Sequence, residues 1–465
     1  MNTRFAQLMT ACSVLLGAPT HGDELNAGAA ATDRPTYRVV SLSSRGGASN
    51  SANGINNEGL ITGSTDAADG ASREAALWFH GFRFDLGTLG GPNSNVAWPV
   101  KNRIGLIAGI AQTDIVEPLG QTWSCRSFFA FPTRSGFICS AVAWENGKIR
   151  ALPTLGGYNG FATGANDHRQ IVGWAQNTVL DPSCNPVHVK QQFHAVMWGP
   201  GENQILDLVP LQGDTTSAAT AINNKGQVVG ISGNCGTAVG GTSAREAVMW
   251  ERGQPRVLGN LGGIAWNTPM ALNDRGDVVG FSNVSKQSGA APNWRAFMWT
   301  KERGIQDLGA LDGYPLSQAL GINEKRQVVG TSCTADFSAC RAVLWLHGRI
   351  IDLNDLAPGY ADVLYAANDI NDDGDIAGQA FTPDTQQYSA VLAIRERRTQ
   401  REGDAGTFAA ARSRDARLPS AVRQALLQQF GLDESASHVR AMNASILRAS
   451  TTMGTPPPFT TASLN

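Results

Sequence analysis

Short apolar stretches and tight turns alternate from about residue 50 to residue 393, in a pattern that recurs seven times. The first half of each copy reads Ile-Asn-x-x-Gly-x-φ-φ-Gly, where φ is apolar. The seven copies of this half lie at 55–63, 101–109, 165–173, 222–230, 272–280, 322–330 and 370–378. The second half is Ala-x-x-Trp, which is missing its Trp only in the seventh copy and otherwise ends at Trp78, Trp144, Trp198, Trp250, Trp299 and Trp345. Such a period indicates one supersecondary unit copied along the chain.

Each copy is expected to form four short strands, here called a, b, c and d. In the fourth copy they are predicted at Ser217–Asn223, Gln227–Ser232, Ala247–Trp250 and Arg256–Leu258. The Asn-x-x-Gly link between a and b predicts a tight hairpin, because Asn caps the turn and Gly accepts a left-handed backbone. Arg169 and Arg326 replace that Gly in two copies, at a cost of about 1 kcal/mol each.

Strand c is apolar on both faces, as in Ala195-Val196-Met197-Trp198. A strand of this kind must be covered on both sides. We therefore predict an all-β fold, a seven-bladed β-propeller of four-stranded blades. The segment 36–42 is expected to supply the missing strand d of the seventh copy, beside 390–394, and so to close the ring. An open solenoid or a pair of sandwiches would leave that spare strand unexplained.

The repeat resembles the HAF family of probable extracellular repeat proteins over about residues 36–395. The family's His-Ala-Phe triplet before the aromatic residue of strand c is split here between His194-Ala195-Val196 and Arg295-Ala296-Phe297. The INxxGxφφG segments and DLGTLGG at 85–91 match the family more fully. The resemblance implies an exported repeat protein, and it brings no agreed activity and no catalytic residues.

The two ends of the chain differ from the repeats. Residues 1–30 read as an export signal, with Arg4 before an apolar stretch from Phe5 to Leu16. A lipoprotein signal at Cys12 and an uncleaved N-terminus are the alternatives. Residues 396–465 begin with a charged linker and continue with a helix predicted over Leu418–Leu432, a possible second helix and a disordered tail. That extension could pack on the repeats, remain loose, or dock a partner.

Composition and charge narrow the choice of partners and compartment. The formal net charge is −2, which argues against a nucleic-acid binder, since such proteins carry a basic domain or stripe. No apolar run reaches the roughly 20 residues that span a bilayer. An even number of cysteines remains once the export signal is removed, as suits an oxidising compartment. We expect a secreted or periplasmic monomer.

The six remaining cysteines all lie in b–c loops. They are Cys125, Cys139, Cys184, Cys235, Cys333 and Cys340. The first two and the last two can close loops locally, and Cys184 and Cys235 could then bridge the matching loops of adjacent blades. The disulfides either hold a binding surface or only stiffen long loops, at roughly 2–4 kcal/mol each.

Two faces follow from this topology. The loop face carries the b–c loops and d–a crossovers, and the turn face carries the a–b and c–d turns. Because the insertions lie in b–c loops, the loop face is the predicted binding surface. Aromatic rings and amides suit a sugar or a protein ligand, or they only cover the channel rim. The candidate ligand-binding residues are Tyr158, Asn159, Trp266, Asn267, Tyr314 and Tyr360.

Signals for catalysis, metals and cofactors are few. No GxSxG, P-loop or dinucleotide-binding motif appears, and no cofactor or metal is expected. Asp114, Glu117 and Asp181 are the candidate loop carboxylates. Residues 369–376, DINDDGDI, match the opening of a calcium loop. They also align with the a–b turn of every other copy, and turn chemistry is the preferred explanation.

The leading hypothesis is an exported, non-catalytic propeller that binds a glycan or a protein through its loop face. The alternative is a secreted hydrolase or lyase with acidic residues at the channel mouth. A structural envelope protein that docks through residues 396–465 is a third.

Overall fold

The structure is a computed structural model that describes residues 34–396, apart from 100, 122–124, 126–127, 130–135, 185–188, 202, 236–240, 285–292 and 336–337. The predicted export signal with Cys12, the charged linker and the C-terminal helices lie outside the described residues. Within the described part, no helix is long and apolar enough to span a bilayer.

The fold is all-β and propeller-like, as the repeat predicts. Five sheets have four strands each, and a larger sheet runs in the order β26-β27-β28-β2-β3-β4-β5 with β1 on the other edge of β28. Only the pair Ser49–Tyr388 joins β28 to β2 in that larger sheet. It therefore divides into two four-stranded halves, so that the described strands form seven groups of four.

Each group contains antiparallel strands in the order a, b, c, d. The a strands are β2 (Gly46–Ile55), β6 (Gly90–Asn95), β10 (Gly156–Ala165), β14 (Thr216–Ile222), β18 (Thr268–Leu272), β22 (Leu316–Ile322) and β26 (Val363–Ile370). The b strands are β3 (Ile61–Ala67), β7 (Ile107–Val116), β11 (Ile171–Leu180), β15 (Val228–Gly233), β19 (Val278–Asn283), β23 (Val328–Cys333) and β27 (Ile376–Thr382).

The two outer strands complete each group. The c strands are β4 (Arg73–Phe79), β8 (Phe137–Glu145), β12 (Gln191–Trp198), β16 (Glu246–Glu251), β20 (Trp294–Thr300), β24 (Cys340–Leu346) and β28 (Gln387–Arg395). The d strands are β5 (Phe82–Asp85), β9 (Lys148–Ala151), β13 (Ile205–Leu208), β17 (Gln254–Val257), β21 (Gly304–Gly309), β25 (Arg349–Asp352) and, for the seventh group, β1 (Tyr37–Ser41). Two short 3-10 helices lie at Gly241–Ala244 and Leu353–Leu356.

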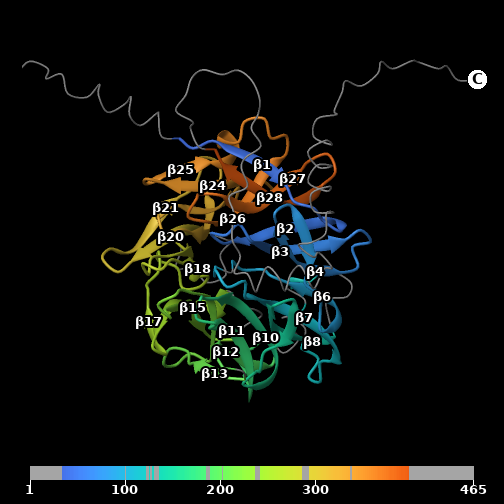
Figure 1. Cartoon of the computed structure of the whole chain (residues 1–465). Helices are drawn as coiled ribbons and strands as arrows, with labels where there is room; N and C mark the ends of the chain where they lie inside the picture. Colours follow the sequence, from blue (N-terminus) through green and yellow to red (C-terminus); the bar gives the residue numbers. More distant parts are fainter. Residues whose placement is uncertain are drawn as a thin grey trace, which may run out of the picture.

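The N-terminal strand completes the seventh group. β1 pairs antiparallel with β28, with Tyr37 opposite Arg395 and Ser41 opposite Val391. Figure 1 shows β1, in blue, beside the orange strands of the last repeat. The predicted pairing of residues 36–42 with residues 390–394 is confirmed.

The core lies between neighbouring groups. Val172 and Ala195 of the third group pack with Ala219, Val248 and Trp250 of the fourth. The Trp250 indole also donates from Nε1 to the carbonyl oxygen of Val209 at 3.0 Å, in the preceding crossover. Both faces of the c strands are thus covered, as their two-sided apolar pattern requires.

Candidate functional site

The asparagine of each repeat organises its a–b turn. In the fourth copy, Asn223 Oδ1 accepts hydrogen bonds from the backbone N–H of Lys225 at 3.1 Å and of Gln227 at 3.0 Å. Its Nδ2 donates to the carbonyl oxygen of Asn273 in the next copy at 3.0 Å. The predicted capping role is confirmed, and the same side chain also ties each turn to the next one.

These amide contacts run from turn to turn through all seven copies. The donors are Asn56, Asn102, Asn166, Asn223, Asn273, Asn323 and Asn371. The acceptor is the asparagine carbonyl of the next copy, except that Asn102 donates to Ala165, one residue earlier, at 3.4 Å. The series returns to its start, since Asn371 donates to the carbonyl oxygen of Asn56 at 3.3 Å.

The residue after each asparagine forms a second tier of contacts. The side-chain oxygen of one turn accepts from the backbone N–H of the preceding turn. Asp274 accepts from Asn224 N at 2.8 Å, Glu324 from Asp274 N at 2.6 Å, and Asp372 from Glu324 N at 2.8 Å. These carboxylates are therefore held in place by the backbone.

The turns surround a cavity of about 300 Å³, which we call the turn-face cavity. Its walls are aliphatic side chains from the ends of the a strands, and its mouth is polar. The lining residues are Ile55, Asn56, Asn57, Lys101, Asn102, Arg103, Asp167, Ile222, Asn223, Asn224, Leu272, Asn273, Asp274, Ile322, Asn323, Glu324, Ile370, Asn371 and Asp372.

The mouth of this cavity is acidic on one side. Arg103 pairs with Asp167 at 3.0 Å, whereas no ion pair within the described residues neutralises Asp274, Glu324 or Asp372. Burial raises the pKa of Glu324, and the like charges of Asp274 and Asp372 add to the rise.

Two cationic side chains of the same turns approach the acidic side of the mouth. Arg275 Nε donates to the carbonyl oxygen of Glu324 at 3.0 Å, and Lys325 Nζ donates to that of Asp372 at 2.5 Å. Both cations therefore bind backbone oxygens, and the outer oxygens of Asp274 and Asp372 accept from neutral amides, Asn224 Nδ2 at 3.0 Å and Asn57 Nδ2 at 2.7 Å.

Lys101 lies at the floor of the cavity. Its Nζ is 2.8 Å from Asp369 Oδ1 and donates to the carbonyl oxygens of Ile322 and Ile370 at 2.6 and 2.9 Å. Asp369 is fully buried, and its Oδ2 accepts from Ile55 N at 2.9 Å. Burial raises the pKa of Asp369, while the charge of Lys101 opposes the rise.

Turn chemistry accounts for residues 371–375, as predicted, but Asp369 has a different role. Asn371 caps the turn through its own Oδ1, which accepts from Asp373 N and Asp375 N. Asp369 instead lies on β26 and pairs with a lysine of the second copy. The sequence held a signal for this pair, since Asp369 and Lys101 are the two charged residues at positions that the other copies fill with small or apolar side chains.

The six predicted ligand-binding residues occupy two kinds of environment. Asn159 and Asn267 are 2% and 0% exposed. Asn159 binds Cys139 N and Gln176 Oε1, and Asn267 donates to the carbonyl oxygens of Arg245 and Gly263. These two amides are thus used within the protein.

The four aromatic members of that set are more accessible. Tyr158 and Trp266 are 36% and 39% exposed. Arg341 lies over the ring of Tyr314, and the Tyr360 hydroxyl is 3.3 Å from Ser41 Oγ. Within the described residues, no hydrogen bond, ion pair or ring contact joins one of the six to another, and none of them lines the turn-face cavity.

The loop-face carboxylates also serve the local structure. Glu117 is buried and accepts from Gln121 N at 2.6 Å. Burial would raise the pKa of Asp181, but hydrogen bonds, those of Thr215 and Ser183 foremost, bring it below its usual value. Asp114 is exposed, and His194 pairs with Asp207 at 3.0 Å, away from the cavity.

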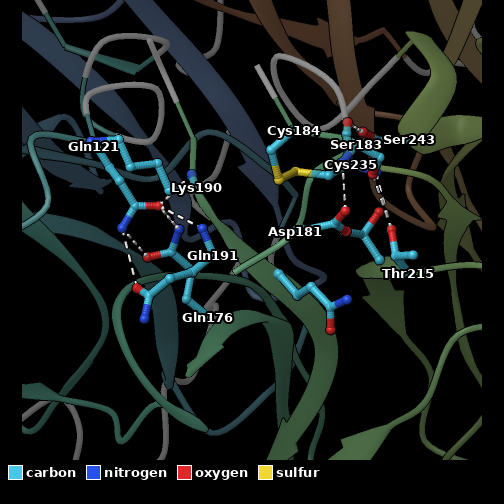
Figure 2. The surroundings of a disulfide bond; sticks show 12 residues. Gln121, Gln176, Asp181, Ser183, Cys184, Lys190, Gln191, Thr215, Cys235 and Ser243 are labelled. Atoms are coloured by element: carbon cyan, nitrogen blue, oxygen red, sulfur yellow. Dashed lines mark hydrogen bonds between the residues drawn. A yellow bond between two sulfur atoms is a disulfide. The ribbon is translucent and has the colours of Figure 1, made fainter. Parts of the chain in front are cut away.

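The three predicted disulfides are present. Cys125 pairs with Cys139, Cys333 with Cys340, and Cys184 with Cys235 between the third and fourth groups. Asp181 lies next to the Cys184–Cys235 bridge, with a carboxylate oxygen within 4.8 Å of both sulfur atoms, but the disulfide occupies both sulfurs (Figure 2).

A buried glutamine network lies beside the bridge that joins Cys184 and Cys235. Gln121 Oε1 accepts from Gln176 Nε2 at 2.8 Å and from the backbone N–H of Lys190 at 2.8 Å and of Gln191 at 3.1 Å (Figure 2). The loop after β7 is thereby bound to the third group. These residues use their polar atoms to fold the loop onto its neighbour.

Comparison with known proteins adds distant similarities. No family model matches the chain, and no curated protein is similar to it in sequence. Among solved structures, the chain is similar to an acylaminoacyl peptidase of Pyrococcus horikoshii, with a TM-score of 0.42, 10% identity, and coverage of 76% of this chain and 53% of that one. It is also similar to the Trypanosoma rangeli sialidase in complex with sialic acid, with a TM-score of 0.36, 11% identity, and coverage of 77% and 58%. The chain spans about half the length of these proteins, and similarity of this degree carries no inference about activity.

Proposed function

We propose that the chain is an exported, non-catalytic binding protein, a closed seven-bladed β-propeller of HAF-like repeats that takes a cationic ligand into the turn-face cavity. Closure of the ring is supported by the pairing of β1 with β28 and by the hydrogen bond from Asn371 to Asn56. Export is supported by the three disulfides, because such bonds persist in oxidising compartments.

One observation carries the choice of ligand. Three consecutive turns place Asp274, Glu324 and Asp372 at the mouth of a cavity of about 300 Å³, without an ion-pair partner within the described residues. One oxygen of each carboxylate accepts from a backbone N–H. The second oxygen of Asp274 accepts from Asn224 Nδ2 at 3.0 Å and that of Asp372 from Asn57 Nδ2 at 2.7 Å, so these negative charges meet neutral donors, and a cationic ligand would supply the missing positive charge. The aliphatic walls suit the methylene groups of an alkylamine or of a lysine side chain of a protein partner.

Calorimetric titration of the purified full chain with spermine tests this proposal. We expect binding that weakens as salt rises, because exposed charges are screened. Glu324→Gln should weaken binding about tenfold, the equivalent of losing roughly 1.4 kcal/mol. Asp384→Asn is the matched control, since this exposed aspartate lies in the β27–β28 loop and does not line the cavity. Equal affinity of both variants for spermine, or no binding by the wild type, would refute the proposal.

The loop face is a second candidate, for a glycan or protein ligand. The exposure of Tyr158 and Trp266 favours it, because accessible aromatic rings stack on sugars and anchor protein interfaces. A glycan array probed with wild type and with Tyr158→Ala and Trp266→Ala tests it directly. Binding that survives both substitutions would place the ligand elsewhere.

The hydrolase or lyase alternative needs a carboxyl group at the cavity mouth, and Glu324, which lies there between the turns of Asp274 and Asp372, is the candidate general acid. A panel of chromogenic glycosides and esters measures this. Turnover that Glu324→Gln abolishes, and that Asp384→Asn does not affect, would favour the enzyme over the binding protein.

A further inference from the structure

Lys101 and Asp369 are complementary exceptions in the inner end of the repeat. At the position of Lys101, the other copies have Ile55, Ala165, Ile222, Leu272, Ile322 and Ile370. At the position of Asp369, they have Gly54, Val100, Gly164, Ala221, Ala271 and Gly321. One unit therefore supplies a cation and another supplies an anion, where all the remaining side chains are neutral.

The two residues meet across the inner ends of the a strands. Lys101 belongs to the second copy, whereas Asp369 and Ile370 belong to the seventh and Ile322 to the sixth. The ammonium donates hydrogen bonds to the carbonyl oxygens of Ile322 and Ile370, at 2.6 and 2.9 Å, and forms an ion pair with Asp369 Oδ1 at 2.8 Å. Its coordination resembles that of a bound ion.

The surroundings are shaped to hold this carboxylate. Asp369 is 0% exposed, and a buried charge is costly unless it is paired. A Cβ added at Gly321 would lie 2.8 Å from the Cα of Asp369 and 2.9 Å from its Oδ1. Any larger residue at position 321 would therefore clash with Asp369, and glycine avoids that clash.

We infer that the Asp369 carboxylate and the carbonyl oxygens of Ile322 and Ile370 form an axial cation site, which the chain fills with the ammonium of its own Lys101. The ligand class is a primary ammonium or a monovalent ion such as potassium, which carbonyl oxygens bind in place of water. All three oxygens lie farther from Nζ than the 2.0–2.1 Å of magnesium, and those of Asp369 and Ile370, at 2.8 and 2.9 Å, lie beyond the 2.3–2.6 Å of calcium. The site lies at the floor and does not depend on the ligand proposed for the mouth.

Chemical rescue of Lys101→Met tests the site. Removing the lysine leaves the Asp369 carboxylate buried without a charged partner, and the melting temperature should fall by roughly 5–10 °C. Ammonium chloride should restore part of the loss, potassium chloride should do so to a smaller extent, and tetramethylammonium chloride at equal ionic strength should restore none. The wild type should not distinguish these salts.

Lys101→Met/Asp369→Asn is the matched control. Without the carboxylate, it should melt above the single variant and show no preference for ammonium. Equal melting of Lys101→Met in all salts, or the same preference in the double variant, would overturn the inference.

A measurement on the wild type covers the case in which Lys101→Met does not fold. Reductive methylation followed by peptide mapping compares Lys101 with the exposed Lys148. Because the Lys101 ammonium is ion-paired with a buried carboxylate and donates two hydrogen bonds, its methylation should be at least about tenfold slower, which corresponds to roughly 1.4 kcal/mol of protection. Equal rates at the two lysines would refute a filled site.

Discussion

Arg326 of the sixth repeat binds Asp277 of the fifth through two parallel hydrogen bonds. Nε lies 2.8 Å from Oδ2, and Nη2 lies 2.9 Å from Oδ1. Burial alone would raise the pKa of Asp277, but the hydrogen bonds from Arg326 and Asn273 bring it below its ordinary value of 3.8. The pair thus links neighbouring units by a bidentate contact, the strongest geometry available to arginine and a carboxylate.

The stabilisation from this pair should depend on pH. A lowered pKa in the folded state means that the contribution is complete above about pH 3.8 and is lost as the pH falls through the folded value. Asp277→Asn should lower the free energy of unfolding at pH 7 by about 1–2 kcal/mol, since Arg326 is half-exposed. Urea denaturation of wild type and variant at pH 7, 5 and 3 checks this. A difference that does not shrink at pH 3 would contradict it.

The two arginines in left-handed turns make a matched pair. Arg169 and Arg326 have φ values of 60° and 59° at a position where other copies have glycine. Arg169→Gly should raise the free energy of unfolding by about 1 kcal/mol, because glycine relieves the backbone strain and the contact of Arg169 with Glu145 is exposed. Arg326→Gly relieves the same strain but also removes the ion pair with Asp277. The free energy of unfolding should therefore stay the same or fall. Urea denaturation of both variants measures this difference. An equal gain in the free energy of unfolding for the two variants would show that the ion pair contributes nothing.

The disulfide between repeats should matter more than a local one. Cys184–Cys235 closes a separation of 51 residues and Cys333–Cys340 one of 7. The loop-entropy relation gives about 4 kcal/mol for the first and about 2.5 kcal/mol for the second. Denaturation of the two double-serine variants measures the difference. A larger loss from Cys333→Ser/Cys340→Ser would show that unfolded-state loop entropy does not decide the ranking.

Closure of the ring can be measured at the contact between the seventh and the first repeat, here called the seam. Asn371 and Asn223 make the same turn-capping contacts, but Asn371 donates to the first repeat and Asn223 to the next one in the chain. If the ring is closed, Asn371→Ala and Asn223→Ala should each lower the free energy of unfolding by about 1–3 kcal/mol. A clearly smaller loss for Asn371→Ala would indicate that the seam is open.

The repeat pattern predicted the strands well because each copy carries the same local chemistry. The four strands expected in the fourth copy match β14–β17 within two residues at each end. Cysteine position, combined with strand order, predicted all three disulfides. Repetition supplied this information seven times over, so that a weak signal in one copy was corrected by the others.

The cavity was harder to predict, because a sequence does not show how long loops fold. The loop after β7 is bound down by Gln121 and its partners, and the amides of Asn159 and Asn267 are used internally. The short turns on the other face leave an opening instead. Each of Lys101 and Asp369 is the one charged residue at its position in the aligned repeats. The pair becomes visible only when these two exceptions, of opposite charge and in different copies, are considered together.

The pairing of β1 with β28 fixes an order of events during synthesis. Of the strands described here, β1 leaves the ribosome first and its partner leaves last. For nearly the whole period of elongation, β1 therefore lacks its partner β28. The unpaired N–H and C=O groups along that edge can then bind other extended chains. A product truncated before residue 387 leaves the edge of β1 that pairs with β28 without its partner, and only a chain that includes the final repeat can cover that edge.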